Sequence, residues 1–373
     1  MKGRPERLIC RLKHMRKSKG LSQSQVAELV GVKRQAIYDI ESGRYLPNTE
    51  VALRLARHLG CRVEDLFSEE SHAADRPVVM VEGDAPASSR IAVARVRDRL
   101  VGYPLQGTDS FGQGFRPGEG LLGSDGKTVK LFEDSHRLER TAMLLGCDPA
   151  FGILASYVNR QSAHVWLNCA FASSEKALKR LAAGETHLAA THMHDTGSGQ
   201  SNVTFAKRLL GGIPARVIAF TTFEEGLMVA RGNPHRITGV SDLAQENLRM
   251  VNREPGAALR ALLDERLAAS GVPRRRISGY TRLVSNHEEG AQMVLHGLAD
   301  AALGLRAIAS AFGLDFVILE TVRCDIVIPD DMMEHQAVRV MLDVLQTRAL
   351  RVELASLPGY DPRDTGKAIG TLA

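Results

Sequence analysis

Apolar residues in the N-terminal fifth of the chain recur every three to four positions, which is the spacing of short amphipathic helices. The pattern predicts a first helix over residues 5–18, a second helix capped by Ser22, and a third helix over about 33–42. Thr49 is a suitable cap for a fourth helix, and residues 63–67 add a short fifth. The N-terminal end is therefore expected to be an all-α, five-helix domain.

The pattern changes after residue 140, where apolar runs of strand length alternate with amphipathic stretches of helical length. Such alternation predicts a parallel sheet with helices on both faces. In sheets of this kind, ligands bind beyond the carboxyl ends of the strands, where helix N-termini point backbone N–H groups. Residues 140–373 are therefore expected to form an α/β ligand-binding domain.

Two segments separate these regions. Residues 71–89 are mostly small and polar around one short apolar run and predict a linker, and residues 90–139 predict a few β-strands in a small connecting segment. The stretch 107–126 is rich in glycine, but it lacks the Gly-Lys-Ser/Thr ending of a phosphate-binding loop, so we interpret it as a connection. The chain thus divides into residues 1–70, this linker, this β-rich segment and residues 140–373.

Positive charge is concentrated at the N-terminal end. The first 62 residues hold 14 Lys and Arg against 5 Asp and Glu, a net charge of +9, whereas the whole chain carries +5. The remaining residues therefore sum to −4. A solvated basic face would give the same count, but a local basic excess is also what contact with DNA phosphates requires.

Five cysteines are scattered without a Cys-x-x-Cys pair, and this odd, unpatterned set predicts reduced thiols rather than a disulfide framework. No apolar run approaches the ~20 residues of a membrane helix, and the N-terminus lacks the apolar core of a signal peptide. We therefore expect a cytoplasmic protein with no membrane partner and no cofactor.

Residues 20–46 carry the clearest chemical signal, because they have the layout of a helix-turn-helix with Gly31 at the turn. The second helix of that motif opens with Lys33, Arg34 and Gln35. A helix presenting such side chains can enter the DNA major groove, where Arg pairs with guanine and Gln with adenine. Double-stranded DNA is the expected partner, and a module used only for protein contacts is the alternative.

This stretch resembles the XRE family of lambda-repressor-like DNA-binding domains, and the resemblance covers residues 7–67. The matching residues are Leu21-Ser22-Gln23, Val26-Ala27, Gly31-Val32, Ile37, Ile40-Glu41-Ser42-Gly43-Arg44, Pro47, Leu53 and Leu55-Ala56. The resemblance implies that the residues facing bases are Gln23, Arg34, Gln35 and Asp39. It implies that the residues facing phosphates are Lys33 and Arg44, with Arg16 and Tyr38 as further candidates.

The α/β region resembles the type-2 periplasmic-binding-protein fold, and most closely the branch found fused to helix-turn-helix domains and to molybdopterin-biosynthesis proteins. The resemblance covers about 140–328. The matching segments are Gly146-Cys147-Asp148-Pro149, Gly152, Ser173-Ser174, Leu181-Ala182-Ala183-Gly184-Glu185-Thr186-His187, His192-Met193-His194-Asp195, Glu225-Gly226-Leu227, Gly232-Asn233-Pro234, Asp242-Leu243, Asn252-Arg253, Gly279-Tyr280, His287, Gly297-Leu298-Ala299-Asp300 and Gly313-Leu314-Asp315-Phe316. The fold implies two lobes around a small ligand, chain crossings near 220–232 and 320–328, and a returning helix at 335–355.

Several polar side chains are then expected to line the cleft between the lobes. They are Cys147, Asp148, Ser173, Ser174, His192, His194, Asp195, Arg231, Asn252, Arg253 and His287. Two of them, Ser173 and Ser174, stand at an expected helix N-terminus, which is a ready anion site. The resemblance implies an oxyanion such as molybdate or tungstate, or a molybdenum-cofactor species.

One departure leaves the ligand open. Relatives carry a Gly-Ser-Gly-Thr-Arg-like run after the Asn-Arg pair, whereas this chain has Gly256-Ala257-Ala258-Leu259-Arg260. Two hydroxyl groups that could bind an anion are therefore absent, although the helix amides remain. A molybdate-like oxyanion, another small anion or metabolite, and a pocket without a ligand are the three alternatives.

Two other chemistries fit the same residues. His192, His194 and Asp195, with Cys147 as a spatial possibility, have the character of metal ligands, but a hydrogen-bonded strand end explains them equally, and no metal is expected. Cys147, His192 and His194 could act as nucleophile and base, but the sequence supplies no linked triad. We therefore expect that the protein is not an enzyme.

Together these features predict a ligand-responsive transcription regulator. A single helix-turn-helix module has a small interface, so a homodimer or higher homo-oligomer on a pseudo-palindromic operator is expected. Ligand would close the lobes and change the spacing of two DNA-binding modules. The alternative is a DNA-binding regulator whose C-terminal half only oligomerises.

Overall fold

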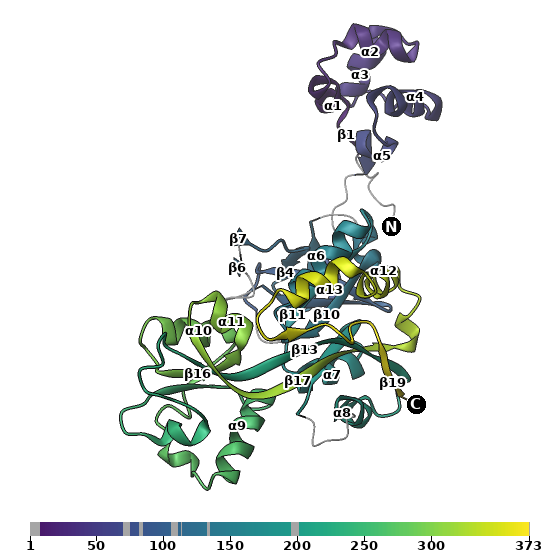
Figure 1. The fold of residues 1–373 in the computed structure, drawn as a ribbon. Coiled ribbons are helices and arrows are strands. Elements are labelled where there is room, and N and C mark those ends of the chain that lie inside the picture. The colour runs from purple at the N-terminus through teal and green to yellow at the C-terminus, as the bar shows by residue number, and fades with distance from the viewer. Residues whose placement is uncertain are drawn as a thin grey trace. The chain divides into compact units, whose positions relative to one another are not determined.

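The chain forms two compact units, residues 1–74 and 75–373. The computed structural model describes residues 8–69, 75–81, 85–105, 111–112, 114–132, 135–194 and 201–372 (Figure 1). Each unit has a hydrophobic core of its own, so each is described by itself. No helix of the described part of the chain combines the length and the apolar character needed to cross a membrane.

The N-terminal unit confirms the five expected helices. They are α1 (Leu12–Ser18), α2 (Gln23–Val30), α3 (Arg34–Glu41), α4 (Thr49–Leu59) and α5 (Val63–Leu66). Buried residues from all five form one core, which includes Leu12, Val26, Ile37, Leu55 and Leu66. Ser22 and Gln25 form a capping box at the start of α2, and Gly31 ends that helix in the left-handed conformation, at φ 72°.

Two details of this unit differ from the sequence prediction. The first helix begins at Leu12 rather than at residue 5, because β1 (Leu8–Cys10) pairs antiparallel with β2 (Phe67–Glu69). The unit is therefore five helices with a two-stranded sheet rather than purely α-helical. Asn48, not Thr49, caps α4, because its side chain accepts a hydrogen bond from the backbone N–H of Val51.

The second unit is organised by a ten-stranded sheet in the order β11-β10-β12-β17-β13-β16-β14-β15, with β18 and β19 also paired to β13. Its strands are β10 (Thr141–Gly146), β11 (Trp166–Phe171), β12 (Leu188–His192), β13 (Ala215–Val229), β14 (Met250–Arg253), β15 (Leu283–Val284), β16 (Ala301–Leu305), β17 (Asp315–Pro329), β18 (Tyr360–Asp361) and β19 (Ala368–Leu372). The two longest, β13 and β17, pair antiparallel throughout and carry the chain between two lobes, as expected (Figure 1).

Helices cover both faces of the first lobe. They are α6 (Phe151–Gln161), α7 (Ser174–Ala182), α8 (Ser201–Leu210), α12 (Gln336–Leu345) and α13 (Arg348–Ala355). Alternate side chains of β10 show which helices cover each face of the sheet. Leu144 packs in a core with α6 and α12 on one face, and Met143 and Leu145 pack in a core with α7 and α8 on the other. The returning segment is two helices rather than one, since a break at Gln346 is followed by a new cap at Thr347.

The second lobe contains α9 (Ala258–Ala269), α10 (His287–Leu295) and α11 (Arg306–Ala311), with short 3-10 turns η3 (Val240–Ala244) and η4 (Arg274–Arg276). One core of this lobe includes residues of α9, and another includes residues of α10 and α11. Strands β14 and β16 supply residues to both cores.

A closed five-stranded barrel precedes the first lobe. Its strands are β3 (Arg76–Met80), β4 (Arg90–Val96), β5 (Arg99–Pro104), β8 (Gly120–Leu122) and β9 (Thr128–Leu131), and β6 (Phe111–Gly112) with β7 (Gly114–Phe115) and the turn η2 (Ser135–Arg140) complete this segment. The segment predicted to be a linker, residues 71–89, thus contains a strand of the barrel, because β3 pairs with β5 and β9. One face of β4 fills the barrel, and the other, with Ala92 and Ala94, shares a core with the first lobe.

Candidate functional site

The recognition helix α3 presents its polar side chains to solvent because its apolar residues are anchored in the core. Ile37 and Ile40 are almost completely buried. The exposed side chains at its start and along its outer face are Lys33, Arg34, Gln35 and Tyr38. This helix can therefore offer the expected side chains to a DNA groove.

Contacts along α3 refine the roles implied by the resemblance. The amide of Gln35 donates to the carboxylate of Asp39 at 3.1 Å, so Asp39 orients Gln35. The guanidinium of Arg44 lies 5.7 Å from the centre of the Tyr38 ring. Among the candidates, these four side chains are therefore held in two pairs.

Arg16 and Gln23 have a structural contact that the sequence did not reveal. The guanidinium of Arg16 binds the carboxylate of Glu41 at 2.5 Å, and the amide of Gln23 donates to the same carboxylate at 2.8 Å. Burial opposes the charge of Glu41, but the hydrogen bonds from Arg16 and Gln23 hold its pKa below the ordinary value. Arg16, at 8% exposed, therefore joins α1 to α3 and is not a free phosphate contact.

The second unit has two adjoining cavities at the carboxyl ends of the first-lobe strands. The outer cavity, of about 140 Å³, is lined by Gly146, Cys147, Asp148, Pro149, Phe151, Gly152, Cys169, Ala170, Phe171, His287 and Glu288. The deep pocket, of about 10 Å³, is lined by Cys147, Ser173, Ser174, His192, Arg253, Ala257, Ala258, Leu259 and His287. Cys147 and His287 line both, so the two cavities belong to one cleft between the lobes.

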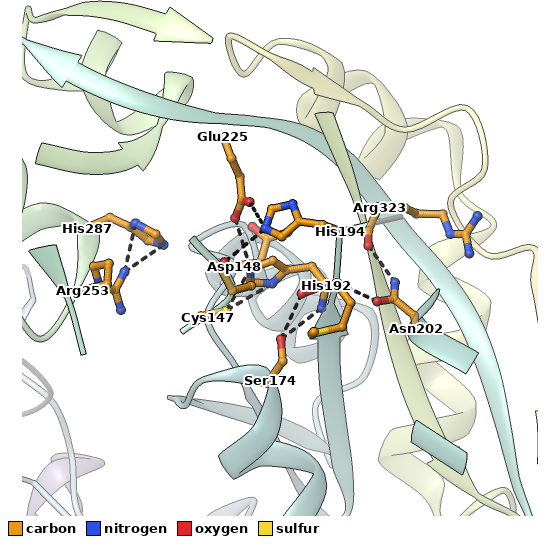
Figure 2. A network of polar contacts seen from close by, with 12 residues as sticks. Cys147, Asp148, Ser174, His192, His194, Asn202, Glu225, Arg253, His287 and Arg323 are labelled. Carbon is orange, nitrogen blue, oxygen red and sulfur yellow. Dashed lines mark hydrogen bonds and ion pairs between the residues drawn. The ribbon is translucent and has the colours of Figure 1, made fainter. Parts of the chain in front are cut away.

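One wall of the cleft is a chain of contacts from a thiol to a buried carboxylate (Figure 2). The sulfur of Cys147 lies 3.3 Å from Nδ1 of His192, and Nε2 of His192 lies 3.1 Å from Oε1 of Glu225. The other oxygen of Glu225 lies 3.5 Å from Nε2 of His194. Glu225 is fully buried, and these contacts hold its oxygens at ion-pair distance rather than in hydrogen-bond geometry.

The position of His192 is fixed from its backbone as well. The hydroxyl of Ser174 accepts a hydrogen bond from the backbone N–H of His192 at 3.1 Å and donates one to its carbonyl at 3.3 Å. Burial opposes a charge on the ring, but Cys147 and Glu225 together raise the pKa of His192 well above its ordinary value. The surroundings of the ring therefore favour its protonated form.

The opposite wall belongs to the second lobe. Arg253 is 2% exposed; one of its terminal nitrogens lies 3.1 Å from Nδ1 of His287, and the other donates to the carbonyl of Ser285. Its guanidinium also lies 5.4 Å from the ring centre of Phe171 in the first lobe. Burial and the neighbouring Arg253 lower the pKa of His287 well below its ordinary value, so this ring is neutral and accepts from Arg253. Nε of Arg253 is buried without a hydrogen-bond partner.

Two other contacts connect the lobes across the cleft. Nε2 of His194 donates to the carbonyl of Ala258 at 3.1 Å, and the ammonium of Lys176 lies 3.7 Å from Glu254. Both contacts join the first lobe to the start of α9 or the strand end before it. The described structure is therefore one in which the lobes touch.

The remaining candidates of the sequence prediction lie elsewhere or serve the scaffold. Asp148 is buried and accepts hydrogen bonds from Tyr360 and Thr221, and Asn252 donates to the carbonyl of Tyr280. Arg231 is exposed in the turn after β13, and neither cavity has it among its lining residues. Asp195 lies outside the described residues. No group of three or more His, Cys, Asp or Glu in the described part of the chain is placed to hold a metal ion.

Comparison with known proteins matches each of the two units to a protein family. A family model described as the PBP superfamily domain matches residues 155–346, and one described as helix-turn-helix matches residues 12–66. The chain belongs to the PBP superfamily. It is a helix-turn-helix DNA-binding regulator with a PBP-like ligand-binding domain, which confirms both resemblances and the two-part fold.

Individual relatives cover each part. The protein YvgK of Bacillus subtilis is 31% identical over 227 residues, which cover 61% of this chain and 73% of that protein. An HTH-type transcriptional regulator of Methanothermobacter thermautotrophicus is 47% identical over 57 residues, 15% of this chain and 83% of the relative. Among solved structures, the sulfate-binding protein SubI from Mycobacterium tuberculosis is 16% identical, covers 60% of this chain and 87% of its own, and has a TM-score of 0.44.

The sequence prediction missed Glu225 as a site residue of this PBP domain. A signal was available, since Glu225 is a charged residue inside the largely apolar run that becomes β13. The bulge between Glu225 and Gly226 in the pairing with β17 marks the same position. Neither feature points to His192 without the tertiary structure, because the two residues are 33 positions apart in the sequence.

Proposed function

We propose that the protein is an effector-responsive transcription regulator whose effector is a small organic anion bound between the lobes of the PBP domain. The observation that carries the proposal is the buried guanidinium of Arg253 beside the N-terminus of α7 in one pocket. Among the ion pairs of described residues none includes Arg253, so the pocket holds a cation without a carboxylate at contact distance. Such a cation favours an anionic ligand.

Helix ends add to this preference. The two cavities are lined by first-turn residues of α6, α7, α9 and α10, and a helix N-terminus carries partial positive charge. Glu225 lines neither cavity, and His192 lies between its carboxylate and Cys147.

The α9 side of the deep pocket favours an organic anion over a bare oxyanion. Ala257, Ala258 and Leu259 line the pocket where the relatives' run supplies hydroxyl groups. The deep pocket, of about 10 Å³, has room for about one water, so a ligand enters it only when the lobes separate further. A tetrahedral oxyanion such as molybdate needs donors on all sides, whereas a small carboxylate can direct its charge at Arg253 and its carbon atoms at this apolar wall. We therefore place small carboxylates ahead of molybdate and tungstate.

The effector acts on DNA binding through the lobes. An anion bound by Arg253 in one lobe and by the start of α7 in the other stabilises the closed arrangement of the lobes. In a homodimer on a pseudo-palindromic operator, this closure changes the spacing of two recognition helices. The alternative, a C-terminal domain that only oligomerises, has no bound effector.

A thermal-shift screen tests the proposal with small carboxylates, molybdate, tungstate, sulfate and phosphate. A carboxylate is expected to stabilise the protein saturably, by roughly 2–3 kcal/mol at a hundred times its Kd, and the shift is expected to disappear in Arg253→Met. Arg231→Ala is the matched control, because Arg231 is exposed outside both cavities. Stabilisation by molybdate alone would reverse the choice of anion, and no shift with any of the probes would favour the oligomerisation alternative.

A further inference from the structure

The five cysteines of the chain occupy different environments, and one of them differs from the rest. Burial raises the pKa of Cys169 to about 12, and burial also raises the pKa of Cys10, Cys61 and Cys324. Cys147 is partly exposed, as are Cys10, Cys61 and Cys169, but it lines both cavities and faces a histidine. Its sulfur is therefore open to small molecules that enter the cleft.

The contact between Cys147 and His192 has the geometry of an activated thiol. Nδ1 of His192 lies 3.3 Å from the sulfur, within reach of the thiol proton. On the far side of the ring, Glu225 lies 3.1 Å from Nε2, so Nε2 keeps its hydrogen and Nδ1 is the nitrogen that takes up the proton. The sequence of nucleophile, base and orienting carboxylate is the arrangement that converts a thiol into a thiolate.

Neighbouring residues hold His192 in place, and Cys147 faces a cavity that can admit a ligand. Ser174 fixes the backbone of His192 by two hydrogen bonds. The outer cavity of about 140 Å³ reaches Cys147 and has room for a molecule of several heavy atoms, since one water needs about 10–15 Å³ on the same measure. Two buried polar groups lie near this space and have no hydrogen-bond partner. They are the carboxylate of Glu225 and Nε of Arg253.

We propose that Cys147, with His192 as proton acceptor and Glu225 as the positioning residue, is a covalent modification site for small soft electrophiles that enter the cleft. The sulfur attacks the electrophilic carbon and forms a carbon–sulfur bond. The leaving group departs with the electron pair of the bond that breaks, and the thiol proton, held at Nδ1 of His192, passes to water. This reactivity goes beyond the proposed effector binding and needs neither the effector nor DNA.

Iodoacetamide labelling of the full-length protein tests the site, with the rate at each cysteine followed by mass spectrometry of its peptide. Only about 0.3% of an ordinary thiol, with a pKa near 8.5, is thiolate at pH 6. Because Nδ1 of His192 is within reach of the thiol proton of Cys147, Cys147 is expected to react at least about tenfold faster than Cys61 at pH 6. His192→Gln is expected to remove this advantage and to leave the rate at Cys61 unchanged.

The controls separate chemistry from folding. His296→Gln, at an exposed histidine of the second lobe, is expected to leave the rate at Cys147 unchanged. If His192→Gln does not fold, the pH profile of the unmodified protein decides by itself, because an ordinary thiol gains about tenfold in rate per pH unit below its pKa and an activated thiol does not. Equal rates at Cys147 and Cys61 at pH 6, or a rate at Cys147 that is unchanged in a folded His192→Gln, would overturn the proposal. Neither result bears on the anion screen, which measures binding without a reactive probe.

Discussion

Oε1 of Glu225 lies 3.1 Å from Nε2 of His192, so a fully buried carboxylate in the strand that crosses between the lobes is paired with the histidine that ends β12. The pair fixes the orientation of the imidazole toward Cys147 on one side and ties the crossover strand to the ligand cleft on the other.

Replacing Glu225 by Gln is expected to destabilise the fold by about 3 kcal/mol at pH 6, because it leaves the buried imidazolium without its partner. The pKa of His192 is raised in the folded state, so the pair's contribution is fully present below about pH 6.5, the value for an unfolded histidine, and is lost as the pH rises through the folded pKa. Urea unfolding at several pH values, followed by the single tryptophan, Trp166 in β11, measures both effects. A stability difference that is the same at every pH would contradict the charge assigned to His192.

His187 is expected to limit stability in acid. Its Nδ1 accepts from the backbone N–H of Met143 and its Nε2 donates to the carbonyl of Arg95 in the barrel, and burial lowers its pKa to about 3. The unfolded chain binds a proton here below about pH 6.5 and the folded chain does not. Stability is therefore lost as the pH falls from about 6.5 toward 3, by up to about 4–5 kcal/mol.

Unfolding of the unmodified protein and of His187→Gln between pH 7 and pH 4 checks this expectation. The variant is expected to be less stable at pH 7, because the contacts to the barrel are altered, and to lose less stability on acidification. His296→Gln, at an exposed position, is the control and should keep the pH dependence of the unmodified protein. An acid limb of equal steepness in His187→Gln would show that another group is responsible.

The ion pair between Arg16 and Glu41 is expected to support the recognition helix. Its side chains are 10% and 3% exposed, so Arg16→Met leaves a buried carboxylate without its partner and should cost about 3 kcal/mol. The double variant Arg16→Met with Glu41→Met should recover most of this loss, because no uncompensated charge remains. Hydrogen exchange of α3 in the full-length protein measures this loss of stability. Equal protection in the single and double variants would argue against a stabilising ion pair between Arg16 and Glu41.

Arg34 and Lys33 are expected to contribute to DNA binding in different ways. Arg34→Ala should relax base preference at one operator position at a cost of roughly 1–3 kcal/mol, because a bidentate contact with guanine is lost. Lys33→Ala should weaken binding to all sequences alike and reduce the salt dependence by about one phosphate contact. Binding to a selected operator and to its single-base variants, at several salt concentrations, separates the two. Unchanged affinity and preference in Arg34→Ala would show that α3 is not the reading helix.

The sequence determined the parts of the protein whose information is local. The spacing of apolar residues, the cap at Ser22 and the turn at Gly31 specify the helix-turn-helix, because each depends on residues within a few positions of one another. The alternation of strands and helices after residue 140 likewise predicted an α/β domain, whereas its two lobes were implied by the resemblance to the periplasmic-binding-protein fold.

Only the tertiary structure decided the features that depend on distant residues. The strand at Leu8–Cys10 exists because it pairs with Phe67–Glu69, and the segment at 76–80 joins a barrel because two later strands pair with it. Arg16 is a structural contact because Glu41 lies beside it in space. Glu225 meets His192 because β12 and β13 both pair with β17, which no local pattern encodes. Local physics fixes elements and their faces, whereas the partners of a buried charge are set by the packing of the whole chain.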